Sequence, residues 1–112
     1  MARRFSRKSK DLLKALRRLG YTLHRGRGDH TKVLFIAPCA DGSDFKFSFP
    51  VDRGEIPEGT FRAMLNQAGG LNEEQLLGAL EGTFTETDYR ALIASRTRTE
   101  LLRLTMGRRF RS

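Results

Sequence analysis

Four leucines recur at helical spacing near the start of the chain. They are Leu12, Leu13, Leu16 and Leu19. Apolar residues three or four positions apart share one face of a helix, so the spacing predicts a helix over residues 9–19, with Ser9 as its cap and Gly20 just past its end. Residues 1–8 are basic and lack an apolar period, which indicates a mobile arm.

From Tyr21 the chain alternates apolar and polar residues, as strands do. The first strand leads through a glycine turn at residues 26–28 into a second strand over residues 31–37. A third strand is marked by three phenylalanines on one face, Phe45, Phe47 and Phe49. Pro50 is expected to end that strand. The three strands together predict an antiparallel meander.

Three helical patterns follow the meander. Residues 60–68 place their apolar side chains on one face, and a glycine pair stops that helix. A capping-box spacing at residues 72–75 opens a second helix over residues 73–80. The last pattern begins near residues 85–87, and its apolar face shifts around residues 96–99, which predicts a kink or break there.

These elements predict one α+β domain, for which 112 residues are sufficient. The helices before and after the meander are expected to cover one sheet face, so that the leucine stripe and the phenylalanine row meet in a two-layer core. The opposite face, with His24, Lys32 or their neighbours, is left for solvent or a ligand. The predicted order is α-β-β-β-α with additional C-terminal helices.

Composition narrows the class of protein. The single cysteine, Cys39, excludes an internal disulfide and a cysteine-rich zinc module. No apolar run approaches the ~20 residues that a membrane-spanning helix needs. The basic start of the chain leads into an amphipathic stretch and not into a secretory signal. We therefore expect a cytoplasmic protein that does not bind membranes.

Charge is distributed unevenly along the chain. Residues 1–32 hold eleven Lys or Arg against two acidic residues, residues 33–82 hold three against eight, and residues 83–112 hold seven against three. A basic segment of this kind is typical of a surface that binds a polyanion such as RNA, because cations that neutralise phosphates release counterions. A basic surface that is merely solvated has the same composition, so the positions of the charges in the fold have to decide between RNA binding and solvation.

Two motifs in a fixed order resemble those of a known family. Gly28-Asp29-His30 begins the second strand, and the pattern Gly-Thr-x-Arg-x-x-Leu-x-Gln-Ala-Gly spans residues 59–69. With the basic first helix and Phe49-Pro50 between them, they resemble the HicA (YcfA-type) toxins of bacterial toxin–antitoxin systems over roughly residues 9–80.

The resemblance implies a fold similar to the double-stranded-RNA-binding domain and the activity of an mRNA interferase. Such a toxin of a type II toxin–antitoxin system is a hydrolase, an RNA endonuclease that cleaves mRNA without metal. A HicB-like antitoxin is the implied partner and would cover the active face. We divide the chain into a basic arm (1–8), a HicA-like domain (9–82) and a helical basic extension (83–112). The sequence leaves the oligomeric state open.

The resemblance marks His30 as the catalytic residue. Cleavage of RNA needs a group that takes the 2′-hydroxyl proton or protonates the leaving 5′-oxygen, and histidine suits either role because its ordinary pKa is about 6.5. Many family members place a second histidine after the Phe-Pro pair, where this chain has Asp52. We interpret Asp52 as a turn residue.

Several other residues are candidates for phosphate binding or support of the reaction. They are Lys32, Arg25, Arg27, Gly28, Lys10, Lys14, Arg17 and Arg18. Lys32 lies two residues beyond His30 and shares its strand face if the strand is regular. Each cation taken alone is more simply a phosphate-positioning or solvated charge. His24 is interpreted as a residue of the sheet surface.

The sequence carries no recognisable cofactor loop or metal site. Two alternatives to a nuclease stay open: a non-catalytic RNA-binding module on the same fold, and an interaction protein whose C-terminal helix is the functional part. For the extension we expect residues 86–95 to pack on the domain, or on a second copy of it. The arginine-rich remainder is expected to reach RNA or an acidic partner.

Overall fold

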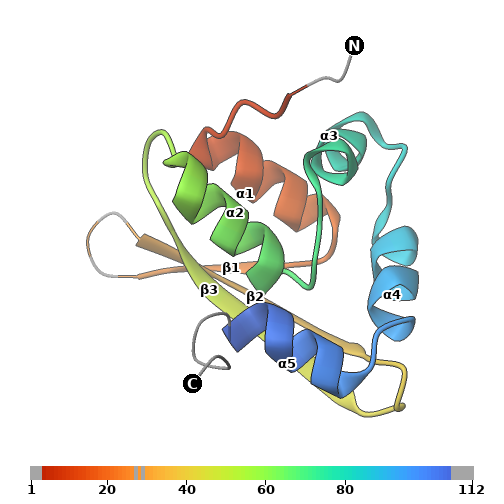
Figure 1. The fold of residues 1–112 in the computed structure, drawn as a ribbon. Coiled ribbons are helices and arrows are strands. Elements are labelled where there is room, and N and C mark those ends of the chain that lie inside the picture. Colours follow the sequence, from red (N-terminus) through yellow and green to blue (C-terminus); the bar gives the residue numbers. More distant parts are fainter. Residues whose placement is uncertain (1–3, 27, 29, 107–112) are drawn as a thin grey trace.

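The computed structural model describes residues 4–26, 28 and 30–106. Its elements run in the order α1 (Ser9–Arg18), β1 (Thr22–Arg25), β2 (His30–Pro38), β3 (Asp44–Asp52), α2 (Glu58–Gln67), α3 (Glu73–Glu81), α4 (Glu86–Ala94) and α5 (Arg98–Met106) (Figure 1). The α+β class and the α-β-β-β-α order with additional C-terminal helices are confirmed. None of the described helices is long and apolar enough to cross a membrane.

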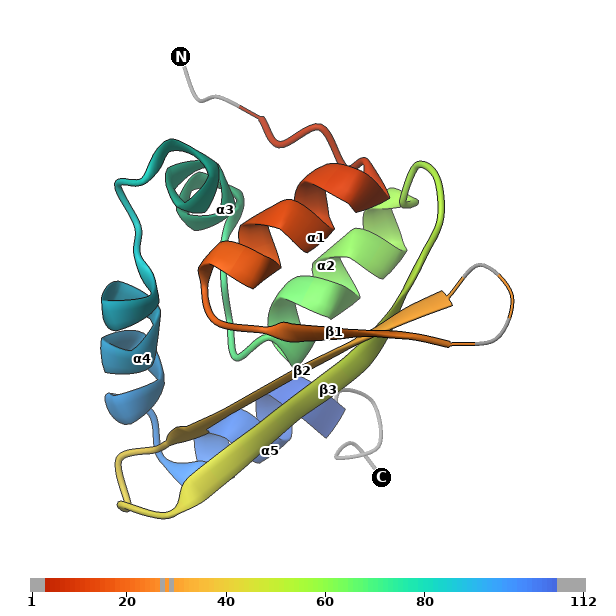
Figure 2. The same ribbon diagram turned by 180° about the vertical axis from the view of Figure 1, so that it is seen from behind.

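The strands form one antiparallel sheet in the order β1-β2-β3. Helices α1 and α2 both contact the sheet, α3 packs on α1, and α4 and α5 lie toward the end of the sheet where β2 turns into β3 (Figures 1 and 2). Burial alternates along the whole of β3, from exposed Asp44 to exposed Asp52. One face of the sheet is therefore covered by helices, and the other is exposed.

The core lies where α1 and the C-terminal helices meet the covered sheet face. From α1 and its end it receives Leu12, Leu16 and Leu19, all at most 2% exposed. From the sheet and from Tyr21, just before β1, it receives a cluster of rings in which Tyr21 and Phe35 have centroids 5.1 Å apart and Phe45 and Phe47 4.9 Å apart. The expected meeting of the leucine stripe with the phenylalanine row is confirmed.

The expectation that Pro50 ends the third strand is wrong. β3 continues to Asp52, and Pro50 lies in the ladder opposite Lys32. Because β3 is an edge strand, a residue without a backbone N–H is tolerated in it. The two residues gained by this extension, Val51 and Asp52, bring β3 level with the first residue of β2.

Ser9 does not cap α1, in contrast to the expectation. The cap position is Lys8, which makes no side-chain cap. Instead, the Ser9 backbone N–H donates to the carbonyl of Gly54 at 2.9 Å, and the Gly54 N–H donates to Ser9 Oγ at 3.0 Å. This pair of hydrogen bonds fixes the start of α1 beside the end of β3.

The interpretation of residues 1–8 as a mobile arm does not hold for the described part, residues 4–8. Phe5 is 3% exposed and stacks on Phe61 with ring centroids 5.7 Å apart. Its backbone N–H donates to the Glu73 carboxylate at 3.2 Å. Burial of one aromatic side chain anchors the segment, a contact that a periodicity search over eight residues cannot find.

The break predicted near residues 96–99 is confirmed, since α4 ends at Ala94 and α5 begins at Arg98. Both helices belong to the core: Tyr89, Ile93 and Leu101 are fully buried. At Gly69, where φ is +92°, an added Cβ would lie 2.7 Å from Ile93 Cδ1. The residue that ends α2 therefore permits close packing of the C-terminal helices.

The described part of the arginine-rich remainder packs on the domain through its apolar side, while Arg98 and Arg103 stay exposed. Leu101 fixes α5 to the core, and the Arg98 guanidinium lies over the Phe45 ring, 5.4 Å from its centroid. The Arg98 backbone N–H donates to the Asp41 carboxylate at 2.9 Å, and its Nη1 donates to the Asp44 carbonyl at 3.2 Å. Arg108, Arg109 and Arg111 lie outside the described residues.

A buried tyrosine pair links α4 to the rest of the domain. The hydroxyls of Tyr21 and Tyr89 lie 2.8 Å apart, and the Tyr89 hydroxyl donates to the Ala68 carbonyl at 2.5 Å. Burial raises the pKa of both phenols above the ordinary value of 10.0. An ionised phenol at this position would lose its hydration without gaining a cation.

We expect this pair to make the fold sensitive to alkali. Both phenols stay protonated in the folded state, whereas the unfolded chain releases these protons near pH 10, so stability is full below that pH and falls as pH rises above it. The two are the chain's only tyrosines, and it has no tryptophan. Tyrosinate absorbance should therefore appear together with unfolding by circular dichroism; ionisation of a folded chain near pH 10 would contradict the prediction.

Candidate active site

His30 and Asp52 face each other across the sheet ladder. His30 is the first residue of β2, Asp52 is the last of β3, and the two are register partners. His30 Nδ1 is in contact with Asp52 Oδ1. The His30 side chain is 57% exposed and that of Asp52 68% exposed. The ring is thus fixed through one nitrogen and accessible to a ligand.

The interpretation of Asp52 as a turn residue is wrong, because β3 extends past Pro50. A signal for this was available in the sequence. Val51 continues the alternation of Phe45, Phe47 and Phe49, which places Asp52 on the opposite, exposed face. A proline in an edge strand does not interrupt that alternation.

A hollow of about 240 Å³ lies beside the pair at the end of the sheet, where residues from both sheet faces line it. It is lined by Ser9, Lys10, Leu13, Arg25, Gly28, His30, Thr31, Val51, Asp52 and Arg53. Of the candidates from the sequence, the fold thus brings together His30, Arg25, Gly28 and Lys10. The hydrogen bonds between Ser9 and Gly54 explain why the start of α1 reaches this place.

A second hollow of about 620 Å³ lies between α1 and β1. It is lined by Lys10, Leu13, Lys14, Arg17, Arg18 and Leu23. Its charged lining residues are all cations, and its apolar part is two half-buried leucines. Lys10 and Leu13 line both hollows, so a cationic groove along α1 leads to the His30 site.

Lys32 lines neither of these two hollows. It lies on the exposed sheet face, between register partners His24 and Pro50. His24 Nε2 is 3.2 Å from the Thr22 hydroxyl. Lys32 therefore shares the face of His30, as the alternation predicted, but stands apart from the hollow. Arg27 lies outside the described residues.

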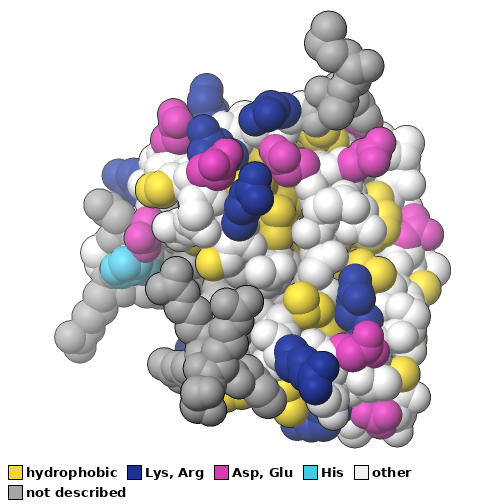
Figure 3. Space-filling view, viewed as in Figure 1, with side chains coloured by type: hydrophobic (Ala, Val, Ile, Leu, Met, Phe, Trp, Pro, Cys, Tyr) yellow, Lys and Arg dark blue, Asp and Glu magenta, His cyan; other side chains and the backbone are white. Residues whose placement is uncertain are grey.

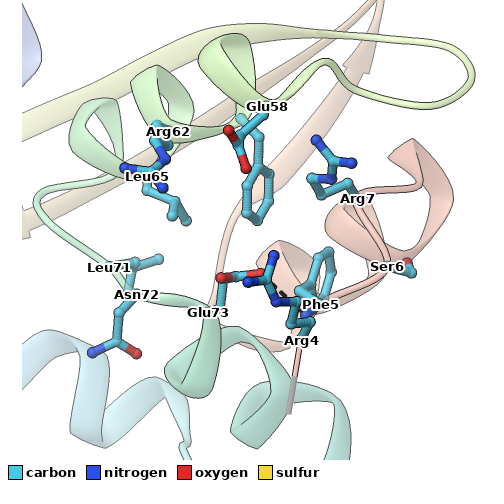
Figure 4. A pocket seen from close by; sticks show the side chains of 11 residues that line it. Arg4, Phe5, Ser6, Arg7, Glu58, Arg62, Leu65, Leu71, Asn72 and Glu73 are labelled. Carbon is cyan, nitrogen blue, oxygen red and sulfur yellow. Dashed lines mark hydrogen bonds between the residues drawn. The ribbon is translucent and has the colours of Figure 1, made fainter. Parts of the chain in front are cut away.

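A third hollow, of about 570 Å³, lies between the N-terminal segment, α2 and α3 (Figure 4). Three arginines line it, but so do Glu58 and Glu73, whose carboxylates point toward its interior (Figure 4). The molecular face in Figure 3 likewise carries basic side chains interspersed with acidic ones. A polyanion is attracted more strongly by the groove along α1, where the charged lining residues have one sign.

Within residues 4–26, 28 and 30–106, no group of three or more His, Cys, Asp or Glu side chains could hold a metal ion. What the site does offer is an imidazole with one nitrogen paired to a carboxylate. Cations from Lys10 and Arg25 line the same hollow. This combination suits proton transfer beside a phosphate group.

Residues 9–69 match the family model described as HicA toxin of bacterial toxin-antitoxin. The match covers α1, the whole sheet and α2, and it includes both His30 and Asp52. It ends before α3, so the helices that complete the core lie outside it. No curated protein and no solved structure matches the chain significantly.

Proposed function

The chain belongs to the HicA toxin family of bacterial toxin–antitoxin systems, and from this premise we propose that it is an mRNA interferase whose catalytic residue is His30. One observation carries the proposal. An accessible imidazole, paired with a carboxylate through Nδ1, lies where an all-cationic groove opens into a hollow. Such a site joins a proton-transfer group to a binding surface for phosphates.

The proposed reaction uses the 2′-hydroxyl of the RNA as its nucleophile. Nε2 of neutral His30 takes the hydroxyl proton, the 2′-oxygen forms a bond to the adjacent phosphorus, and the bond from phosphorus to the 5′-oxygen breaks. The leaving 5′-oxygen takes a proton from water, and the hydroxide so formed takes the proton from His30, which restores the neutral imidazole. The products are a 2′,3′-cyclic phosphate and a 5′-hydroxyl, and the step needs no metal ion or cofactor.

Cations beside His30 have a defined task in this proposal. Negative charge builds on the phosphate as the 2′-oxygen attacks, and positive groups already fixed near it stabilise that charge. Lys10 and Arg25 line the hollow of His30 and supply this field, and Gly28 leaves the turn side of the hollow without a side chain. Lys32, on the same sheet face, supports a neighbouring phosphate.

The groove along α1 gives the RNA its path to the site. Lys10, Lys14, Arg17 and Arg18 are exposed, and Arg18 is positioned by a hydrogen bond from Nη1 to the Leu80 carbonyl at 3.2 Å. We place successive phosphates of the strand along these four cations, with the scissile phosphate at the His30 end. The half-buried Leu13 and Leu23 give the strand an apolar contact.

Membership of a toxin–antitoxin family implies a cognate antitoxin. We propose a HicB-like protein, acting as in a type II system by direct binding to the toxin. An antitoxin that covers His30 and the adjoining end of the cationic groove would block the substrate's access. The charge of that groove favours an acidic surface on the antitoxin.

The proposal is tested with the purified full chain and a labelled single-stranded RNA. We expect cleavage that persists in a metal chelator and leaves 2′,3′-cyclic phosphate and 5′-hydroxyl ends. Contact of four phosphates with the four cations of α1 predicts a slope of about −3 for log K against log salt. The Lys14→Gln/Arg17→Gln variant should reduce the magnitude of that slope by about 1.4.

The matched control is the Lys46→Gln/Arg62→Gln variant, which removes the same charge from β3 and α2. It should keep the wild-type slope. Equal slopes for both double variants would contradict the path along α1. Salt-dependent binding without any cleavage would favour a non-catalytic RNA-binding module over a nuclease.

A further inference from the structure

We infer that Asp52 is a positioning residue for His30, fixing the imidazole tautomer that leaves Nε2 unprotonated. The inference rests on the proposed function, in which Nε2 takes a proton from the 2′-hydroxyl. Its basis is the contact of Asp52 Oδ1 with His30 Nδ1. In this pair the Nδ1–H donates and the carboxylate accepts.

The sheet ladder holds both partners of this hydrogen bond. His30 and Asp52 are cross-strand neighbours at the end of a continuous nine-residue pairing of β2 with β3. On its other side, the His30 carbonyl accepts the Gly26 N–H at 3.0 Å, which closes the first hairpin. The backbone of His30 is thus fixed from both neighbouring strands, and one side-chain contact is sufficient to orient the ring.

The His30–Asp52 pair adds little to the free energy of unfolding. Both side chains are more than half exposed, and exposed pairs contribute little because water screens them and side-chain entropy opposes them. A role in the chemistry accounts for the geometry better. Neutral imidazole has one nitrogen that donates and one that accepts, so a carboxylate at Nδ1 decides that Nε2 accepts.

Replacing Asp52 by asparagine changes the favoured tautomer of His30 while nearly keeping the size of the side chain. Asparagine has nearly the size of aspartate, but its NH₂ group can donate to Nδ1 and so favours the opposite tautomer, in which Nε2 carries the proton and cannot take another. The same substitution at the other end of β3 is the matched control. Asp44 is also exposed and on the same sheet face, opposite Pro38.

The first readout needs no RNA. Nitrogen chemical shifts of the His30 ring are measured by NMR in the ¹⁵N-labelled full-length wild type, in Asp52→Asn and in Asp44→Asn, at a pH where the ring is neutral. We expect the proton on Nδ1 in the wild type and in Asp44→Asn, and a shift of population toward protonated Nε2 in Asp52→Asn. A wild-type distribution of tautomers in Asp52→Asn overturns the inference.

The second readout is RNA cleavage at saturating RNA. Asp52→Asn should reduce the rate by about 10- to 100-fold, less than a buried orienting carboxylate would cause, since water also reaches this pair. Asp44→Asn should keep the wild-type rate, and all variants should keep the wild-type melting temperature. An unchanged rate in Asp52→Asn, with His30→Ala inactive, overturns the positioning role alone. Full cleavage by His30→Ala overturns the proposed function. The pair would then have no catalytic role, even if the NMR measurement shows that Asp52 sets the His30 tautomer.

Discussion

Replacing His30 by alanine is expected to abolish growth arrest on induction and to lower the rate of RNA cleavage by about 10²- to 10⁴-fold. The loss follows from removal of the group that takes the 2′-hydroxyl proton. The fold should be unaffected, because the His30 side chain is 57% exposed and its side-chain partner, Asp52, is also exposed. Cleavage is measured by release of labelled product, and folding by circular dichroism.

His24→Ala is the matched control for this experiment. His24 is the chain's only other histidine, lies on the exposed face of β1 and contacts the Thr22 hydroxyl. It lines neither the His30 hollow nor the groove along α1. The control should arrest growth like the wild type. A fully active His30→Ala variant with normal circular dichroism would exclude His30 as the catalytic residue.

Removal of the C-terminal helices is expected to cost much of the stability of the domain. A chain that ends at Ala94 loses α5 and with it the fully buried Leu101, and a chain that ends at Gly82 also loses Tyr89 and Ile93. Each large buried side chain contributes about 1.5–3 kcal/mol, and a whole domain has only about 5–15 kcal/mol. The shorter chain should fail to fold, and the longer one should lose on the order of 3 kcal/mol or more.

Three further variants keep this test informative if both truncations aggregate. A chain that ends at Met106 keeps every described helix and should melt like the wild type. Leu101→Ala should lower the free energy of unfolding by about 2–5 kcal/mol, and Leu102→Ala, at a half-buried position, by less. Denaturant unfolding measures both. A Leu101→Ala variant as stable as the wild type would contradict the packing of α5 in the core.

Several features of the fold followed from local pattern alone. The capping box at Asn72 and Gln75, the glycines that end α2 and the break before α5 were all predicted correctly. Each depends on hydrogen bonds or backbone conformations within a few residues, so nearby sequence is sufficient. Likewise, the period of the leucines and phenylalanines predicted which helix and sheet faces meet.

Other features needed contacts between distant segments. Ser9 has the residue type of a helix cap, yet its hydroxyl accepts from Gly54, forty-five residues away. Phe5 gave no periodic signal but packs on Phe61. Leu101 stands between exposed arginines in the sequence, and it is fully buried. In each case the stabilising contact is made with a residue far away in the sequence, and a local pattern carries no information on where that residue lies.

The candidate site likewise has features that the sequence predicted and features that depend on the tertiary structure. The sequence by itself determined that a histidine would follow a glycine turn at the start of a strand, and that the first helix would carry basic residues. Only the tertiary structure decided that Asp52 contacts His30 and that α1 begins beside both. The physical reason is register: β3 pairs with β2 through nine residues, so the last residue of one strand meets the first residue of the other.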